Sequence, residues 1–201
     1  MMLGTATGSR TPSGMKVAPM SYKKLEAVAE GVRPYLPATV GPTGETWAID
    51  GQLVLEDTLP RAGFNFHIAQ KDELHQCAAF AMPEQNLVVV REDVYEGLFT
   101  GEVFSRSTVV HELSHIVLRH AVTLHRGAPV GQHEFFEDSE WQANALMAAI
   151  MMPIPACAAA HSATQLAIMC GTSVQSATYR IENLVKRKAI VEKILNGELF
   201  G

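Results

Sequence analysis

The sequence predicts an α+β fold that is mostly helical, with a small sheet of about three strands ahead of its central helix. Two observations lead to this prediction. Residues 64–69, 77–83 and 86–92 alternate in polarity or are β-branched, as strands are. From residue 101 nearly to the end, apolar residues recur at helical spacing. We therefore expect the sheet to come before a long helical part, which ends in a helical hairpin.

The composition sets limits on the class of protein. A chain of 201 residues with 47% hydrophobic and 18% charged content can bury one sizeable core, so one domain with appendages is expected. The net charge of −5 does not favour direct nucleic-acid binding. Three cysteines without C-x-x-C spacing predict neither a disulfide framework nor a cysteine zinc site. No membrane span or signal peptide is apparent, so a cytoplasmic protein is expected.

The first half of the chain is expected to supply the scaffold. Residues 1–19 are rich in Gly, Ser, Thr and Pro, which predicts a disordered leader. Order then begins at Ser21, which can cap a helix over "YKKLEAVAEGV". A second short helix is expected within residues 49–63. The turn composition of "PEQN" predicts that the last two strands form an antiparallel hairpin.

The central helix carries the strongest chemical signal, "VVHELSHIVLRH" at residues 109–120. His111 and His115 are four residues apart, so on a helix their imidazoles can point at one atom. Zinc accepts neutral imidazole nitrogens at such a spacing. In the H-E-x-x-H arrangement Glu112 is a general base that takes a proton from water. The plain alternative, solvated histidines on an amphipathic helix, fits less well because the other helix face is apolar.

A hydrolytic zinc site needs a third protein ligand and an open fourth position. The metzincin continuation G-x-x-H is excluded, because Leu118 and Ala121 occupy its two defining positions. On a continuous helix His120 points roughly 180° away from His111, so we do not expect it to be a ligand.

The next helix, expected within residues 137–153, offers the missing carboxylate. Glu140 falls on the same face as the apolar residues of this helix, where an acidic group calls for a partner. The alternative is that Glu140 only belongs to the helix start, where Ser139 and Gln142 form a capping box. Glu137, one turn earlier, is the reserve candidate.

The C-terminal segment predicts two helices joined at Gly171, with Thr172 and Gln175 as a second capping box. Such a hairpin resembles a DNA-reading module. Residues 173–201 carry only a weak positive excess, with five Lys or Arg against three Glu. Packing against the core or docking of a protein partner is therefore favoured over DNA contact.

Three blocks of sequence together resemble the ImmA/IrrE metallopeptidase family. They are "STVVHELSHIVLRH", "EWQANALMAAIMMP" and "LAIMCGTSVQSATYRIENL", in this order. The family patterns read approximately R-F-T-x-x-H-E-x-x-H, E-x-x-A-N-x-F-A-x-x-x-x-M-P and S-x-x-A-x-x-x-R-L. The sequence departs from them at four packing positions, Ser107, Ser114, Leu146 and Ser176.

The resemblance implies a zincin-like metallopeptidase core over residues 20–153, with residues 154–201 as a helix-turn-helix-like extension packed on it. It implies that His111, His115 and Glu140 bind Zn²⁺, with Mn²⁺ or another divalent metal as options, and that Glu112 is catalytic. Members of the family are cytoplasmic peptidases that cleave helix-turn-helix repressors. The implied function is thus a zinc-dependent endopeptidase that relieves repression of mobile-element or stress-response genes.

Two questions stay open at the level of sequence. The rival function is a non-catalytic metal-binding regulator that binds a repressor or DNA through the C-terminal hairpin. A site with three protein ligands favours catalysis, because structural zinc sites are usually closed by four. The group that assists the oxyanion is also open among Tyr95, Arg106, His125 and His133.

Overall fold

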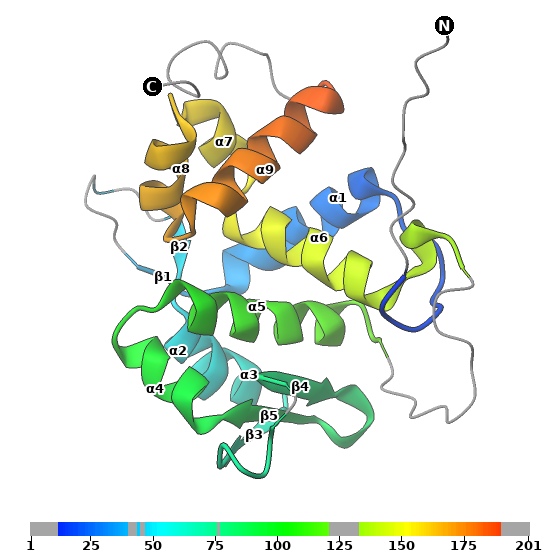
Figure 1. Cartoon of the computed structure of the whole chain (residues 1–201), viewed down its shortest axis with the longest axis vertical. Helices are drawn as coiled ribbons and strands as arrows, with labels where there is room; N and C mark the ends of the chain where they lie inside the picture. Colours follow the sequence, from blue (N-terminus) through cyan, green and yellow to red (C-terminus); the bar gives the residue numbers. More distant parts are fainter. Residues whose placement is uncertain (1–11, 40–43, 45–46, 76, 121–132, 190–201) are drawn as a thin grey trace, which may run out of the picture.

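The computed structural model describes residues 12–39, 44, 47–75, 77–120 and 133–189 (Figure 1). These residues form an α+β structure in which helices predominate and two small sheets occur. The predicted fold class is confirmed at this level. No helix in these ranges combines the length and the apolar character that a membrane span requires.

The N-terminal scaffold begins with α1 (Tyr22–Val32), and Ser21 caps it by accepting a hydrogen bond from the Lys24 N–H at 3.3 Å. The prediction of this helix and its cap is confirmed. A short antiparallel pair, β1 (Ala38–Thr39) and β2 (Ala48–Ile49), follows and was not expected from the sequence. The predicted second helix is a continuous helical segment made of α2 (Gly51–Leu53), a π-helical turn (Val54–Thr58) and α3 (Leu59–Arg61).

The three expected strands form one mixed sheet in the order β3-β5-β4. The strands are β3 (Asn65–Ala69), β4 (Ala79–Met82) and β5 (Leu87–Arg91). The predicted hairpin is confirmed, because β4 and β5 pair antiparallel across the turn at Pro83–Gln85. By contrast, β3 pairs parallel with β5, whose three valines are buried. Within this sheet β4 is therefore an edge strand.

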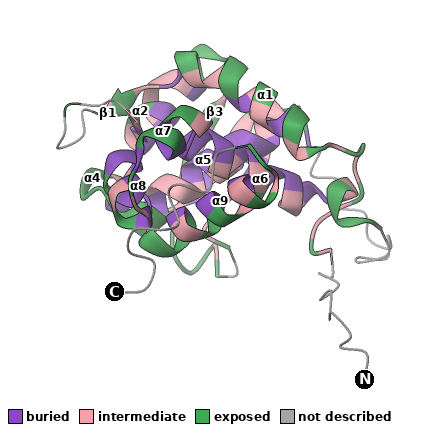
Figure 2. Cartoon of the chain, turned by 90° about the horizontal axis from the view of Figure 1, so that it is seen from above, coloured by how far each residue is buried: buried purple, intermediate pink, exposed green. Residues whose placement is uncertain are grey.

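The longest helix, α5 (Val103–Val117), lies between β4 and α6 (Ser139–Met151), and it contacts both (Figure 1). The preceding α4 (Glu92–Phe99) packs against α5. Val109, Val110 and Leu113 of α5 are buried in the common core. Figure 2 shows that α5 and α6 are buried along much of their length. Polar side chains on these two helices are therefore held in a rigid, packed setting.

Residues 12–20 lie along the start of α6, so the predicted disordered leader is wrong for residues 12–19. The Val17 N–H donates to the Glu137 carbonyl at 2.7 Å, and the Met20 N–H donates to the Phe136 carbonyl at 3.0 Å. Gly14 approaches α6 so closely that a Cβ atom there would lie 2.5 Å from Ser139 Oγ. The absence of a side chain at Gly14 thus lets this segment pack closely against the start of α6. Residues 1–11 lie outside the described part of the chain.

The C-terminal part consists of α7 (Ile154–Ala159), α8 (Ala163–Cys170) and α9 (Val174–Lys186). The predicted join at Gly171 is confirmed, and its φ of 61° suits glycine. The predicted capping box at Thr172 and Gln175 is wrong. Ser173 caps α9 instead, because its Oγ accepts a hydrogen bond from the Ser176 N–H at 3.1 Å.

Ion pairs with Glu26 fasten the α9 region to α1. The guanidinium of Arg180, only 4% exposed, binds both carboxylate oxygens of Glu26 at 2.7 and 2.8 Å. Arg180→Ala leaves the part-buried Glu26 carboxylate with only the longer contact to Arg187, so we expect the free energy of unfolding to fall by about 3 kcal/mol. Arg187→Ala is the matched control, because Arg187 reaches Glu26 only at 3.4 Å and is more exposed. Urea unfolding of both variants measures the difference, and equal losses would contradict this role of Arg180.

Candidate metal centre

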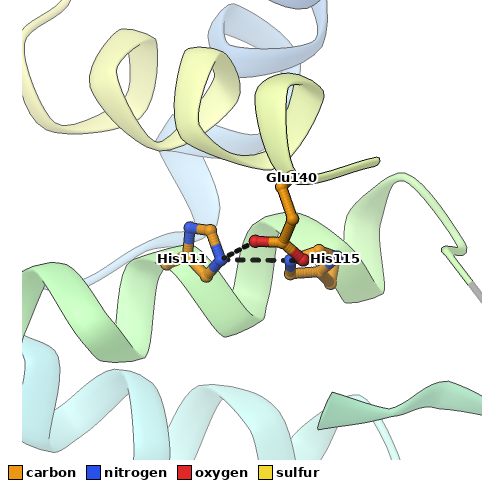
Figure 3. A group of neighbouring side chains, drawn as sticks. All are labelled: His111, His115 and Glu140. Carbon is orange, nitrogen blue, oxygen red and sulfur yellow. Dashed lines mark hydrogen bonds and ion pairs between the residues drawn. The ribbon is translucent and has the colours of Figure 1, made fainter. Parts of the chain in front are cut away.

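The two histidines of the motif converge because α5 is regular through them. Their spacing of four residues places them one turn apart on the same face. His111 Nε2 and His115 Nε2 lie 3.1 Å from each other (Figure 3). Both rings are held by α5, so their convergence requires no movement of the backbone.

Glu140 reaches these histidines from the first turn of α6 (Figure 3). One carboxylate oxygen lies 3.2 Å from His111 Nε2, and the other lies 3.3 Å from His115 Nε2. A tetrahedral zinc ion with ligands at about 2.0 Å separates its ligand atoms by about 3.3 Å. The three side chains form a group that could hold a metal ion.

The charges of this group suit a cation. Hydrogen bonds with His111 and His115 hold the pKa of the Glu140 carboxyl well below its usual value, so the carboxylate is ionised. For His111, burial is the largest single effect and lowers the pKa. Hydrogen bonding to Glu140 and the charges of Glu112 and Glu140 outweigh it, so the pKa of His111 is raised overall. A half-buried anion that attracts positive charge thus lies between two imidazoles.

The start of α6 is not capped by the box of Ser139 and Gln142 that the alternative interpretation required. Asp138 is the N-cap residue, since its Oδ1 accepts a hydrogen bond from the Trp141 N–H at 2.8 Å. Ser139 Oγ accepts a hydrogen bond from the Met15 N–H instead. The Gln142 side-chain amide donates to the Ala18 and Phe136 carbonyls. The capping box of Ser139 and Gln142, considered as the alternative to a ligand role for Glu140, is therefore not formed. Glu140 takes no part in the cap and extends toward α5 (Figure 3).

The reserve candidate, Glu137, is not a member of the group. Its carboxylate pairs with Lys16 Nζ at 3.3 Å and accepts a hydrogen bond from the Glu134 N–H. Of the two acidic residues considered from the sequence, only Glu140 therefore faces the histidines.

Glu112 lies beside the group and is 7% exposed. Burial raises the pKa of its carboxyl, whereas the charges of His111 and His115 act in the opposite direction. A cleft of about 460 Å³ opens here, and Glu112, both histidines and Glu140 all line it. The other walls come from the β4 region, the start of α5 and α6, namely Cys77, Ala78, Ala79, Phe80, Phe104, Ser107, Thr108, Asn144 and Met147. Molecules from solvent can therefore reach the candidate metal centre.

His120 lies closer to the site than a continuous helix predicts. The helix α5 ends at Val117, and Arg119 adopts a left-handed conformation with φ of 53°. The chain therefore turns back, so that His120 Nδ1 lies 3.1 Å from His115 Nδ1. The expected opposite orientation of His120 is wrong, although His120 remains outside the group of three.

The residues considered for oxyanion assistance are engaged elsewhere. The Tyr95 hydroxyl donates to Glu56 at 2.6 Å, and the Arg106 guanidinium donates to the Gly171 carbonyl. His133 faces Asp138 at 3.1 Å. None of these three side chains lines the cleft, and His125 lies outside the described residues. Asn144, which lies on the same face of α6 as Glu140, lines the cleft, and its Nδ2 donates to the Glu140 carbonyl at 2.8 Å.

Comparison of the sequence with models of known protein families finds no match, and comparison with curated proteins finds none either.

Proposed function

We propose that the protein is a zinc-dependent endopeptidase with a zincin-like active site. The observation that carries the proposal is the convergence of His111, His115 and Glu140 at an open cleft, with Glu112 next to them. The arrangement agrees with the ligand order of zincins that use two histidines and a downstream glutamate. The resemblance to the ImmA/IrrE family supports the same conclusion independently of the distances.

Zinc is the proposed metal because the donor set consists of two imidazole nitrogens and one carboxylate oxygen. Zinc binds such ligands in tetrahedral geometry, and catalytic sites combine three protein ligands with one open position. Mn²⁺ or another divalent metal is the second option, because imidazole and carboxylate ligands also suit other divalent ions.

The chemistry proposed here is hydrolysis of a peptide bond. When bound, zinc supplies Lewis-acid chemistry, because it draws electron density from a carbonyl group and makes water more acidic. Glu112 accepts the proton of the attacking water and then passes it to the nitrogen of the leaving amine, as the C–N bond breaks. Burial strengthens Glu112 as a base, since it raises the pKa of the carboxyl.

The edge strand β4 offers a way to bind the substrate. Ala79 and Phe80 of β4 line the cleft, and β4 pairs only with β5 in the described sheet. An extended peptide can add to such an edge through main-chain hydrogen bonds. Proteolysis of an extended segment therefore fits the site better than hydrolysis of a compact small molecule.

The proposed substrate is a helix-turn-helix repressor, and the proposed location is the cytoplasm. Both follow from the resemblance to the ImmA/IrrE family. The rival function, DNA binding through α8 and α9, has less support because Arg180 and Arg187 both pair with Glu26. These pairs commit two of the basic residues of this segment to packing, which leaves a weaker positive surface for phosphate contacts.

Incubation with a candidate repressor tests the substrate class. The purified protein, loaded with zinc, is expected to cut the repressor encoded nearest its own gene into discrete fragments, which mass spectrometry identifies. A chelator should abolish the cleavage, and added zinc should restore it. An intact repressor in the presence of zinc would argue against this substrate. Cleavage that persists after complete removal of metal would argue against the mechanism.

A further inference from the structure

The buried amide of Gln142 has its orientation fixed by two carbonyl groups. Gln142 is 1% exposed, and its Nε2 lies 2.8 Å from both the Ala18 and the Phe136 carbonyl oxygens. Carbonyl oxygens only accept hydrogen bonds, so the NH₂ group of the amide must face them. The amide oxygen of Gln142 consequently points at His120 Nε2, at 3.1 Å.

This orientation determines the tautomer of His120. The Gln142 oxygen only accepts, so a hydrogen bond with it requires a proton on His120 Nε2. A neutral imidazole carries one N–H, and His120 Nδ1 is then an acceptor. The opposite tautomer would bring two lone pairs face to face among buried groups, and an unmade hydrogen bond is costly there.

The same reasoning passes from His120 to His115. His120 Nδ1 lies 3.1 Å from His115 Nδ1. Since the His120 nitrogen accepts, His115 must donate from its Nδ1. His115 Nε2 is the atom that faces His111 and Glu140. In the metal-free protein a proton on this nitrogen is donated to the Glu140 carboxylate. A metal ion would displace that proton and leave the one on Nδ1, which is the tautomer a metal ligand requires.

We propose that His120 and Gln142 are positioning residues that set the tautomer and ring orientation of His115, so that its Nε2 is ready to bind metal. This inference rests on the proposed metal centre. Metal-bound histidines usually donate their second ring N–H to a carboxylate, a carbonyl or water. Here a second histidine takes that place, and Gln142 links it to the Ala18 carbonyl of the N-terminal segment.

Ring nitrogen resonances of the metal-free wild-type protein test the chain of hydrogen bonds directly. With ¹⁵N-labelled histidine, NMR is expected to show the proton of His120 on Nε2 and a proton on His115 Nδ1. A proton on His120 Nδ1 with an unprotonated Nε2 would overturn the proposal. This measurement needs no bound metal, so its outcome is separate from that of the proposed function.

Zinc affinity tests the consequence with two variants of nearly equal shape. His120→Leu removes the acceptor for His115, and losses of this kind weaken metal binding about 10- to 100-fold. His120→Asn places an amide oxygen near the position of Nδ1, so we expect a clearly smaller loss. The exposed His161 provides the control, since His161→Leu should bind zinc like the wild type.

Competition with a chromophoric chelator gives the zinc dissociation constants of the four proteins. Equal affinities of His120→Leu and the wild type would overturn the proposal, as would equal losses in the Leu and Asn variants. A wild-type protein that binds no zinc would instead refute the proposed metal centre, and the NMR result would still decide the chain from Gln142 to His115.

Discussion

Glu112→Gln is expected to lower kcat for peptide hydrolysis about 10²- to 10⁴-fold, the usual contribution of a general base. Glutamine has nearly the shape of glutamate but cannot accept the proton of the attacking water. Because Glu112 is not one of the three residues that could hold the metal, the variant should bind zinc and fold as the wild type does. Single-turnover kinetics, together with zinc content and circular dichroism, separate the chemical step from binding.

An adjacent buried residue provides the control for this prediction. Ser114 lies on the same helix, and its hydroxyl donates to the Val110 carbonyl at 2.8 Å. Ser114→Ala should therefore keep most of the activity. A Glu112→Gln enzyme that retains full kcat would contradict the role of Glu112 as the base.

Glu140→Ala is expected to weaken zinc binding by more than about 100-fold, beyond the effect of losing a supporting residue. The variant leaves two imidazoles as protein ligands, an incomplete set for a tightly held catalytic ion. Glu137→Ala is the matched control, because Glu137 lies one turn earlier but pairs with Lys16. It should retain zinc.

Chelator competition on the two glutamate variants measures this difference. If Glu140→Ala keeps the wild-type affinity, or if only Glu137→Ala loses zinc, the assignment of the third ligand is wrong. Activity should fall in parallel with zinc occupancy in Glu140→Ala and recover partly at high zinc concentration.

The elements that the sequence predicts well are those set by local patterns. Ser21 lies before a helical run and caps α1, and the turn composition at residues 83–86 predicts the hairpin of β4 and β5. The parallel pairing of β3 with β5 depends on contacts between distant strands, which no local pattern encodes. The spacing of His111 and His115 is likewise local, so their convergence is predictable from the motif alone.

The helix caps were assigned incorrectly where two neighbouring residues can each cap the same helix. Asp138 and Ser139 can both cap α6, and the Met15 N–H engages Ser139, which leaves the cap to Asp138. Similarly, Ser173 takes the place of Thr172 at the start of α9. Contacts with distant segments decide such cases, and single-sequence reasoning does not include them.

The position of His120 was missed for a different reason. Helical periodicity extends through "HIVLRH", yet α5 ends at Val117 and Arg119 takes a positive φ. Arginine has no preference for this conformation, so nothing local signals the turn. After the turn, His120 hydrogen-bonds His115 of α5 and Gln142 of α6. Its position therefore depends on contacts with two helices.

The central claim is that His111, His115 and Glu140 together bind one catalytic zinc ion. X-ray absorption at the zinc edge tests it most directly on the purified, zinc-loaded protein. We expect one zinc per chain, with two imidazole nitrogens and oxygen ligands all at about 2.0 Å. A shell that contains sulfur at about 2.3 Å, or one that lacks imidazole, would contradict the claim.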